Sequence, residues 1–251
     1  MSYMIAITGK GGVGKTTISS LLVRALIQNG KKPVLAIDAD PNSCLDAALG
    51  VTVTKTVGGA REEVRDEAQK GLAAGISKQQ FLQMKIEESL VESEGFDLIS
   101  MGRPEGAGCY CYANNVLKAV ISQISGQYPY VVLDNEAGLE NLSRRIVQSV
   151  NMLVLVSDAS NAGLQTLVRL HALAEEMNIQ YSKLLLVVNR LRGDKLPERL
   201  AEIKEQTGAH AVIGIPDDHE LAAFAEENRS FMQLPANNKT LELINGIVAE
   251  I

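Results

Sequence analysis

Short apolar runs alternate with longer stretches of helical periodicity along this chain. The runs are rich in Val, Ile and Leu, which is typical of strands that are buried on both faces of a sheet. Between them, apolar residues recur at three- and four-residue spacing, the spacing of one helix face. The pattern predicts strands at Met4–Thr8, Pro33–Ile37, Phe96–Met101, Tyr130–Leu133, Met152–Val156, Leu184–Val188 and Ala211–Ile215, and helices at Ile18–Gln28, Asn115–Ile124, Leu164–Met177 and Pro197–Gln206.

The alternation of strand and helix predicts an α/β fold, a doubly wound, mostly parallel sheet of about seven strands flanked by helices. Residues 1–251 are expected to form a single domain, because one sheet with helices on both faces reaches this length. Ligands of such sheets bind at the carboxyl ends of the strands. Candidate chemistry is therefore expected in the loops that directly follow predicted strands.

One connection is much longer than a plain crossover between two strands. Residues 52–95 carry the charged run Arg61–Glu67 and are predicted to form a long helical insertion. The insertion is either one or two solvated helices packed on the sheet edge, or a mobile lid or partner-docking surface. The C-terminal stretch Leu241–Ile251 is amphipathic with acidic charges, so we expect a helix that caps the body and not a membrane anchor.

The composition narrows the class of partner. Apolar residues make up 46% of the chain and Trp is absent, so the core must be largely aliphatic. A net charge of −6 argues against a surface that holds nucleic acid or anionic lipid by charge alone. No apolar stretch approaches the roughly 20 residues of a membrane span. We expect a cytoplasmic protein whose partners are proteins and small ligands, with no nucleic acid and no membrane among them.

The loop after the first strand, Gly9-Lys-Gly-Gly-Val-Gly-Lys-Thr16, matches the phosphate-loop pattern G-x-x-x-x-G-K-[ST] and opens a predicted helix. Glycines let consecutive backbone N–H groups and the helix N-terminus face a polyphosphate. Lys15 is expected to reach the β- and γ-phosphates, and the Thr16 hydroxyl to hold Mg²⁺. The pattern predicts an ATPase with ATP and Mg²⁺ as cofactors, bound through Gly11, Gly12, Val13, Gly14, Lys15, Thr16 and Thr17.

A second lysine, Lys10, directly follows the first glycine of this loop. Lys10 to Thr17 resembles the deviant Walker A sequence, Lys-Gly-Gly-x-Gly-Lys-Thr, of the MinD-type and nitrogenase iron-protein-like ATPases. The resemblance implies that Lys10 crosses a two-fold interface to the nucleotide of the partner subunit. The protein would then be an ATP-dependent homodimer. A solvated surface lysine is the alternative.

Two further strand ends resemble the same family. Asp38-Ala-Asp-Pro-Asn42 is similar to switch I, and Asp134-Asn-Glu-Ala-Gly138 is similar to the Walker B and switch II pattern D-x-x-x-G. The resemblance implies that Asp40 orients or deprotonates the attacking water, while Asp38 and Asp134 lie at the Mg²⁺ ion and the Gly138 N–H senses the γ-phosphate. Carboxylates bordering a phosphate site repel it, so a bound Mg²⁺ rationalises them. Turn or cap residues are the alternative.

The resemblance also implies a site for the base. Val187-Val-Asn-Arg190 ends a strand in the manner of the family's adenine-side asparagine, so Asn189 is expected to contact the purine edge. Ile215-Pro-Asp-Asp218 resembles the last-strand loop that closes over the base, with Pro216 packing on it and Asp218 accepting a hydrogen bond. Asn and Pro-Asp are also common in ordinary turns.

The loop after the third strand, Gly102-Arg-Pro-Glu-Gly-Ala-Gly-Cys-Tyr-Cys-Tyr112, is rich in glycine and contains Cys-x-Cys. One chain supplies two neighbouring thiolates here, whereas a closed soft-metal site usually has about four ligands. Across a two-fold axis, Cys109 and Cys111 from both subunits would complete an S₄ site for Ni²⁺ or Zn²⁺. The alternatives are a redox pair or two unrelated thiols.

The remaining cysteine and the histidines of the chain do not indicate a metal site. Cys44 has no second ligand near it in the sequence, so we expect it to be a buried small hydrophobic residue. His171, His210 and His219 share no ligand spacing. Ordinary packing or surface roles are expected for these three histidines.

The Cys-x-Cys loop narrows the resemblance. Nitrogenase iron proteins take a second cysteine from switch II, and this chain has none there. The loop looks, together with Asp134–Glu140 and Leu142-Ser-Arg-Arg145, like that of CooC-type accessory ATPases, which insert nickel into carbon monoxide dehydrogenase or the related acetyl-CoA synthase. The resemblance implies an ATP-dependent metallochaperone whose partner is the catalytic subunit of one of these enzymes in its apo form. The rivals are a reductase with an interfacial iron–sulfur cluster and a MinD-type ATPase for spatial organisation.

Overall fold

Parallel strands form the centre of the protein. Its structure, a computed structural model, describes residues 2–70, 77–102, 118, 121, 124–136, 148–193, 195–249 and 251. The described strands form an eight-stranded sheet in the order β3-β4-β2-β5-β1-β6-β7-β8. Their bounds are β1 (Tyr3–Gly9), β2 (Val34–Ala39), β3 (Val91–Ser93), β4 (Phe96–Ser100), β5 (Tyr130–Asn135), β6 (Ser149–Asp158), β7 (Gln180–Leu191) and β8 (Ala211–Pro216).

The strand pairing confirms the predicted fold class. All neighbouring strands are parallel except β3 and β4, which are antiparallel. Each predicted apolar run lies within or overlaps one strand, and the extra strand is β3. The apolar pattern could not reveal β3, because it is three residues long and two of its side chains are exposed. An edge position leaves such a strand with no apolar face to bury.

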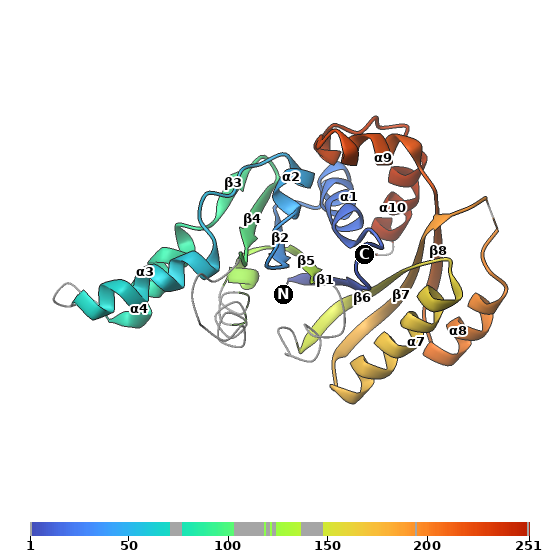
Figure 1. Ribbon diagram of the computed structural model, residues 1–251, viewed down its shortest axis with the longest axis horizontal. Helices are drawn as coiled ribbons and strands as arrows, with labels where there is room; N and C mark the ends of the chain where they lie inside the picture. Colours follow the sequence, from blue (N-terminus) through green and yellow to red (C-terminus); the bar gives the residue numbers. More distant parts are fainter. Residues whose placement is uncertain are drawn as a thin grey trace.

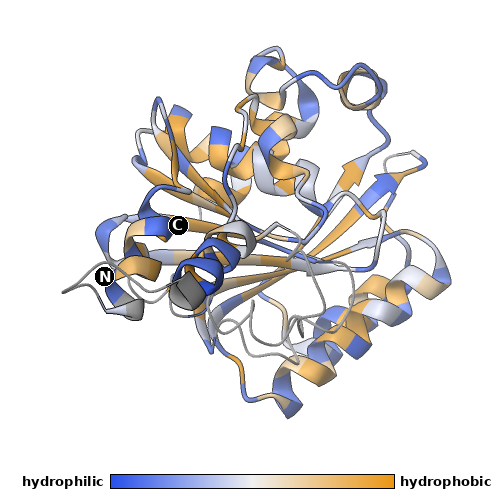
Figure 2. Ribbon diagram, turned by 60° about the vertical axis from the view of Figure 1, so that its left-hand side comes forward, coloured by the Kyte–Doolittle hydropathy of each residue, from blue (hydrophilic) through white to orange (hydrophobic). Residues whose placement is uncertain are grey.

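Helices cover both faces of the sheet (Figure 1). One face carries α1 (Lys15–Gln28), α2 (Leu45–Leu49), α9 (His219–Glu226) and α10 (Lys239–Ala249), and the other carries α7 (Asn161–Glu176) and α8 (Arg199–Thr207). Short 3₁₀ helices are η1 (Ser125–Gln127) and η2 (Phe231–Gln233). Figure 2 shows hydrophobic residues concentrated on the strands and on the helix sides that face them. No helix in the described ranges has the length and apolar character needed to cross a bilayer.

The predicted helices are found where the structure describes them. The apolar residues of α10 at Leu241, Ile244 and Ile247 are fully buried, and the helix packs on α1, as expected of a C-terminal cap. The predicted helix Asn115–Ile124 lies largely outside the described residues.

The long connection after β2 contains α3 (Val57–Lys70) and α4 (Lys78–Glu87), which extend side by side beyond the β3 edge of the sheet (Figure 1). The two helices pack mainly on each other and not flat on the sheet edge. Lys85 of α4 forms ion pairs with Glu63 and Glu88, each at 3.1 Å. The base of the pair is joined to the body by a hydrogen bond from the Gly58 N–H to the Met101 carbonyl, at 2.9 Å.

Candidate functional site

The phosphate loop joins β1 to α1 at the centre of the sheet's carboxyl edge. Gly14 has φ +94°, and a Cβ there would lie 2.4 Å from Asn189 Nδ2. A Cβ on Gly9 would lie 2.3 Å from the Val156 carbonyl oxygen. The backbone contact at Gly9 leaves no room for a side chain, and the positive φ of Gly14 is one that residues with a side chain rarely adopt, so glycine is favoured at both positions. The loop backbone thereby lies directly against β6 and the end of β7.

The N-terminus of α1 offers uncapped backbone donors. Its N-cap residue is Gly14, no side chain caps it, and the first turn carries no acidic residue. Free N–H groups and the positive end of the helix dipole favour an anion at this position. The predicted residues Gly11 to Thr17 therefore surround a site with the chemistry of a phosphate cradle.

Lys15 begins α1 and is largely buried. Its ammonium lies 3.4 Å from the Lys10 carbonyl oxygen, within the loop. Burial lowers the pKa of Lys15, and the negative charges of Asp134, Asp40 and Glu136 oppose this shift. The nearby carboxylates thus favour the charged form of the Lys15 ammonium, which lies inside the loop.

Two buried carboxylates lie side by side near the carboxyl edge of the sheet. Asp38 is the penultimate residue of β2 and Asp134 the penultimate residue of β5, the two are register partners on adjacent strands, and each is only 1% exposed. Asp38 accepts hydrogen bonds from the backbone N–H groups of Asp40 and Leu45, both at 3.0 Å. Asp134 accepts one from the Ser19 hydroxyl at 3.0 Å.

The pKa values of this pair show the cost of holding two carboxylates in a buried place. Burial raises the pKa of Asp38 to about 7, and the negative charge of Asp134 adds to the shift. Burial likewise raises the pKa of Asp134 to about 6, although hydrogen bonds from Thr16 and Ser19 lower it in part. A divalent cation would relieve both the repulsion and the lost hydration. The donor set of two carboxylates and the Thr16 hydroxyl consists of the oxygen ligands that Mg²⁺ prefers.

Asp40 lies two residues beyond Asp38 in the loop after β2 and is half-buried. Its Oδ1 accepts hydrogen bonds from the backbone N–H of Asn42 at 2.8 Å and from the Asn42 amide at 3.0 Å. These contacts hold the Asp40 carboxylate in place at the carboxyl end of the sheet. The structure thus brings together four of the predicted site residues, Lys15, Asp38, Asp40 and Asp134.

A pocket lined by both apolar and polar side chains adjoins the phosphate loop. It is lined by residues of the loop, of α1, of the ends of β7 and β8, of α9 and of α10: Gly14, Thr17, Ile18, Leu21, Asn189, Arg190, Ile215, Pro216, Asp217, Asp218, Leu221, Ala222, Ala225 and Thr240. Asn189 donates from Nδ2 to the Val13 carbonyl at 2.8 Å and accepts from the Arg190 N–H at 2.9 Å. The predicted residues Asn189, Pro216 and Asp218 all lie in this pocket.

The Asp218 carboxylate, which was expected to accept a hydrogen bond from the base, is engaged by donors within the chain. Its Oδ1 accepts from the N–H groups of Glu220 and Leu221, and its Oδ2 accepts from the Asn238 amide and the Thr240 hydroxyl. A carboxylate offers about four lone-pair sites, so donors of the chain itself use its capacity. The geometry does not favour Asp218 as a direct acceptor from the base.

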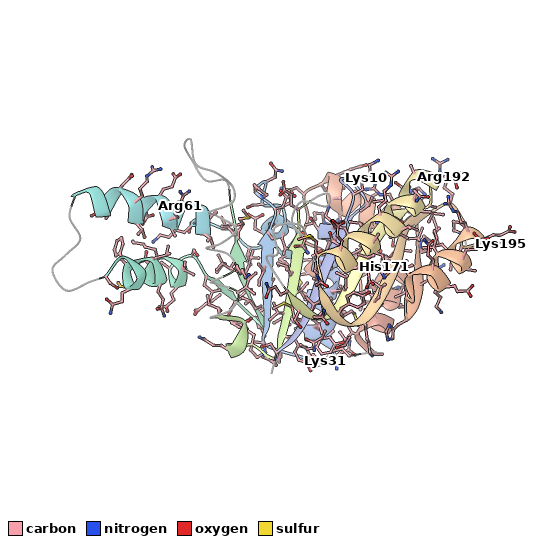
Figure 3. The ribbon with its side chains drawn as sticks, turned by 90° about the horizontal axis from the view of Figure 1, so that it is seen from below. Lys10, Lys31, Arg61, His171, Arg192 and Lys195 are labelled. Carbon is pink, nitrogen blue, oxygen red and sulfur yellow. The ribbon has the colours of Figure 1, made fainter. Side chains whose placement is uncertain are left out.

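Lys10 is exposed at the outer edge of the loop, and Figure 3 shows it on the same side of the molecule as Arg192. Its charge acts on Asp158 at the end of β6. A hydrogen bond from the Ser160 side chain lowers the pKa of Asp158, and the charges of Lys10 and Arg190 contribute to this shift. An exposed lysine at this place has room to reach a group outside its own chain.

Three predicted site residues, Cys109, Cys111 and Gly138, lie outside the described residues. Cys44 is exposed, so the expectation of a buried cysteine was wrong. It lies in the turn before the short helix α2, where the neighbouring Leu45 takes the buried position. Within the described ranges, no group of three or more His, Cys, Asp or Glu is arranged to hold a metal ion.

The three histidines were expected to have ordinary roles. The Nε2 atom of His171 is 3.2 Å from the Tyr181 hydroxyl, and Nδ1 of His210 accepts a hydrogen bond from the Leu184 N–H at 3.3 Å. His219 is the first residue of α9 and is exposed. These positions agree with packing and surface roles.

Sequence reasoning missed several residues of the site. Ser19 follows Thr16 by one helical turn, so the (i, i+3) spacing was an available signal for a second hydroxyl on the same face. Asn135, beside Asp134, donates to the Ile7 carbonyl at 2.9 Å and ties β5 to β1. Thr240 lies far from the other pocket residues in the sequence, and no local pattern connects it with them.

Comparison with known proteins places the chain among its relatives. The profile of the CobQ/CobB/MinD/ParA nucleotide binding domain matches residues 4–231. An uncharacterized ATP-binding protein of Methanocaldococcus jannaschii is 39% identical over 99% of this chain and 98% of its own length. The carbon monoxide dehydrogenase accessory protein CooC of Rhodospirillum rubrum is 33% identical over 70% of each chain.

Among solved structures, the cell division ATPase MinD of Pyrococcus furiosus superposes with a TM-score of 0.70 over all of both chains. Its sequence identity with this chain is 20%, so the similarity is one of fold. The eight-stranded arrangement described above is therefore shared with that protein.

Proposed function

The chain belongs to the CobQ/CobB/MinD/ParA family of nucleotide-binding domains, and on that premise we propose that it is an ATPase that acts as an ATP-dependent dimer. The observation that carries the proposal is the junction of the uncapped α1 N-terminus, the buried Lys15 and the carboxylate pair Asp38 and Asp134. These groups supply what a magnesium-bound triphosphate needs: backbone donors, one cation and oxygen ligands for the metal.

The residues present fit ATP with Mg²⁺. The loop backbone from Gly11 to Gly14 would bind the phosphates, while Thr16, Asp38 and Asp134 would hold the metal directly or through water. Mg²⁺ supplies charge neutralisation on the phosphate oxygens. The pocket between Asn189 and Pro216 would bind the base, with Ile18 and Leu21 forming part of its apolar wall.

The proposed reaction is transfer of the γ-phosphoryl group to water. Water attacks the γ-phosphorus, the bond to the β–γ bridging oxygen breaks, and ADP and phosphate leave. Asp40 would orient the water and accept its proton, because it lies at the carboxyl edge beside the phosphate loop. Lys15 would neutralise charge on the β- and γ-phosphates, and Lys10 would do so on the nucleotide of the partner subunit. The Gly138 N–H is assigned to the γ-phosphate by resemblance.

The proposed cellular task is nickel insertion into carbon monoxide dehydrogenase or acetyl-CoA synthase. Its support is the similarity to the CooC accessory protein, together with the Cys-x-Cys sequence at Cys109 and Cys111. The cysteines of two subunits would hold one Ni²⁺ or Zn²⁺ as cargo, and ATP-driven approach of the subunits would change that site. The protein partner would be the apo catalytic subunit of the nickel enzyme. A cytoplasmic location is part of the same proposal.

A MinD-type role in spatial organisation is the second candidate, favoured by the fold shared with a cell division ATPase. The net charge of −6 weighs against a membrane or DNA surface as its partner. An iron-protein-like reductase is less favoured, because switch II of this chain contains no cysteine.

One experiment separates these functions. Anaerobic titration of the apo-protein with Ni²⁺ and Zn²⁺, followed by measurement of molecular mass with and without ATP, should give one metal per dimer and an ATP-dependent rise in mass. Iron and labile sulfide in the protein as purified without air would instead indicate the reductase. Cosedimentation with anionic vesicles or DNA, without metal binding, would indicate spatial organisation and contradict the metallochaperone proposal.

A further inference from the structure

The two helices that close the base pocket begin at residues whose side chains are hydrogen-bonded to each other. Asp218 is the N-cap of α9, and its Oδ1 accepts from the N–H groups of Glu220 at 3.0 Å and Leu221 at 3.1 Å. Asn238 directly precedes α10, and its Oδ1 accepts from the Leu241 N–H at 3.1 Å. Each side chain therefore satisfies backbone donors at the start of its own helix.

The other polar side-chain atoms of the two capping residues, Asp218 Oδ2 and Asn238 Nδ2, connect the two helices. Asn238 Nδ2 donates to Asp218 Oδ2 at 3.0 Å and to Glu220 Oε2 at 2.9 Å. The Thr240 hydroxyl donates to the same Asp218 Oδ2 at 2.7 Å. Asn238 and Thr240 are 6% and 2% exposed, so the bonds are shielded from water on the α10 side. Loss of a partner in such a place leaves a buried polar group unsatisfied.

These bonds join separate walls of the base pocket. Pro216 and Asp217 form one wall, Leu221 and Ala222 come from α9, and Thr240 comes from α10. The Asp217 N–H donates to the Leu191 carbonyl at 2.9 Å, which fixes the wall to β7. Asp218 follows this wall directly in the chain and bonds both to α9 and to the start of α10, so it connects all three.

Electrostatics also favour a carboxylate at this position. Each helix N-terminus carries about half a positive charge, so two N-termini placed together repel each other. The Asp218 carboxylate lies between them. Burial by itself would raise the pKa of Asp218, but hydrogen bonds from Thr240, Leu221, Asn238 and Glu220 together lower it. The ionised form is therefore the one that the network binds.

We infer that Asp218 is a positioning residue for the base: it holds α9 and α10 together around the pocket and does not itself contact the nucleotide. The inference rests on the proposed nucleotide site and adds the residue that sets the shape of its base pocket. The phosphate loop and the carboxylate pair lie at other strand ends, so Asp218 acts on nucleotide affinity and base selection more than on turnover.

The variant Asp218→Asn separates the two roles of this side chain, which are to cap α9 and to bond to the start of α10. Its Oδ1 can still accept from Glu220 and Leu221, but its amide then faces the Asn238 amide, and two donors oppose each other. Asp218→Asn should weaken ADP binding roughly tenfold, raise KM for ATP and leave kcat near the wild-type value. Discrimination between ADP and GDP should fall as well. Glu226→Gln, at the far exposed end of α9, is the matched control and should change none of these values.

A rescue variant tests positioning against direct contact. In Asp218→Asn/Glu220→Gln/Asn238→Asp, an acceptor at position 238 faces the amide at position 218, and the uncharged side chain at position 220 no longer repels that acceptor. Recovery of ADP affinity would support positioning, because the carboxylate has moved to the other helix. Recovery of nucleotide-free thermal stability without recovery of affinity would overturn the inference and indicate direct contact. Unchanged ADP affinity in Asp218→Asn would also overturn it, whereas absence of ADP binding by the wild-type protein would refute the proposed function itself.

Discussion

Asp38 and Asp134 face each other as register partners at the carboxyl ends of β2 and β5, and both are almost completely buried. Strand pairing brings these two carboxylates together although they lie far apart in the sequence. Such an arrangement costs free energy without a counter-ion. The pair forms part of the magnesium site that we propose, and its properties lead to the first prediction.

The metal-free protein should lose stability as the pH rises from about 4 to about 7. The folded-state pKa of Asp38 is raised to about 7 and that of Asp134 to about 6, above the unfolded value of about 3.9. The unfolded state then releases protons that the folded state retains, so the free energy of unfolding falls with pH in this window. Denaturation in EDTA at pH 5 and pH 8 measures the change. Asp38→Asn should reduce it, and an equal pH dependence in both proteins would contradict the assignment.

Lys15→Ala should remove most ATP binding. The substitution deletes the charge that lies within the phosphate loop and leaves the apolar core of α1 intact, so the fold should persist. Titration with a fluorescent ATP analogue measures the affinity, and circular dichroism checks the fold. The control is Lys32→Ala, an exposed lysine before β2. Wild-type affinity in Lys15→Ala would show that the loop does not bind phosphate through this residue.

Asp40→Asn should bind ATP and hydrolyse it slowly. An amide can hydrogen-bond to water but cannot accept its proton, so turnover should fall by roughly 10²- to 10⁴-fold. The amide oxygen can still accept from Asn42, which preserves the loop. Phosphate release under saturating ATP measures kcat. Normal turnover would exclude Asp40 as the base.

Lys10→Ala should bind ATP as a monomer and fail to form the ATP-dependent dimer efficiently. If Lys10 acts on the nucleotide of the partner, mixing Lys10→Ala with Asp40→Asn should restore part of the activity. One site of the mixed dimer then has its own Asp40 and the lysine of its partner. Mass measurement with ATP and phosphate release from the mixture provide the data. A mixture no more active than its components would indicate that Lys10 acts within its own subunit or only at the surface.

Replacement of both Cys109 and Cys111 by Ala should abolish tight binding of one Ni²⁺ or Zn²⁺ per dimer and spare ATP binding. The thiolates and the phosphate loop follow different strands, so the two functions should separate. Metal and ATP should also be linked, because a metal held by two subunits stabilises the dimer by mass action. Anaerobic equilibrium dialysis measures the stoichiometry. Cys44→Ala is the control, and one metal per monomer or undiminished binding in the double variant would contradict an interfacial site.

Much of the fold could be predicted from the sequence, because parallel strands buried on both faces require continuous apolar runs. The runs at Met152–Val156 and Leu184–Val188 lie inside β6 and β7, whose central residues are fully buried. The phosphate loop could be predicted equally well, because its glycine pattern reflects local backbone geometry: Gly12 and Gly14 have positive φ, and a Cβ on Gly9 would collide with the Val156 carbonyl. The strand β3 could not be predicted, because an exposed edge strand of three residues has no apolar pattern to detect.

By itself, the sequence determined which candidate residues stand at which strand ends: Lys15 in a loop of glycines, and carboxylates after two apolar runs. Only the tertiary structure decided which of them meet and what each is free to do. Strand order made Asp38 and Asp134 neighbours, and the packing of α9 against the start of α10 engaged Asp218 with donors of the chain itself. Local patterns record what one segment must bury, whereas contacts between distant segments depend on how the whole sheet and its helices pack.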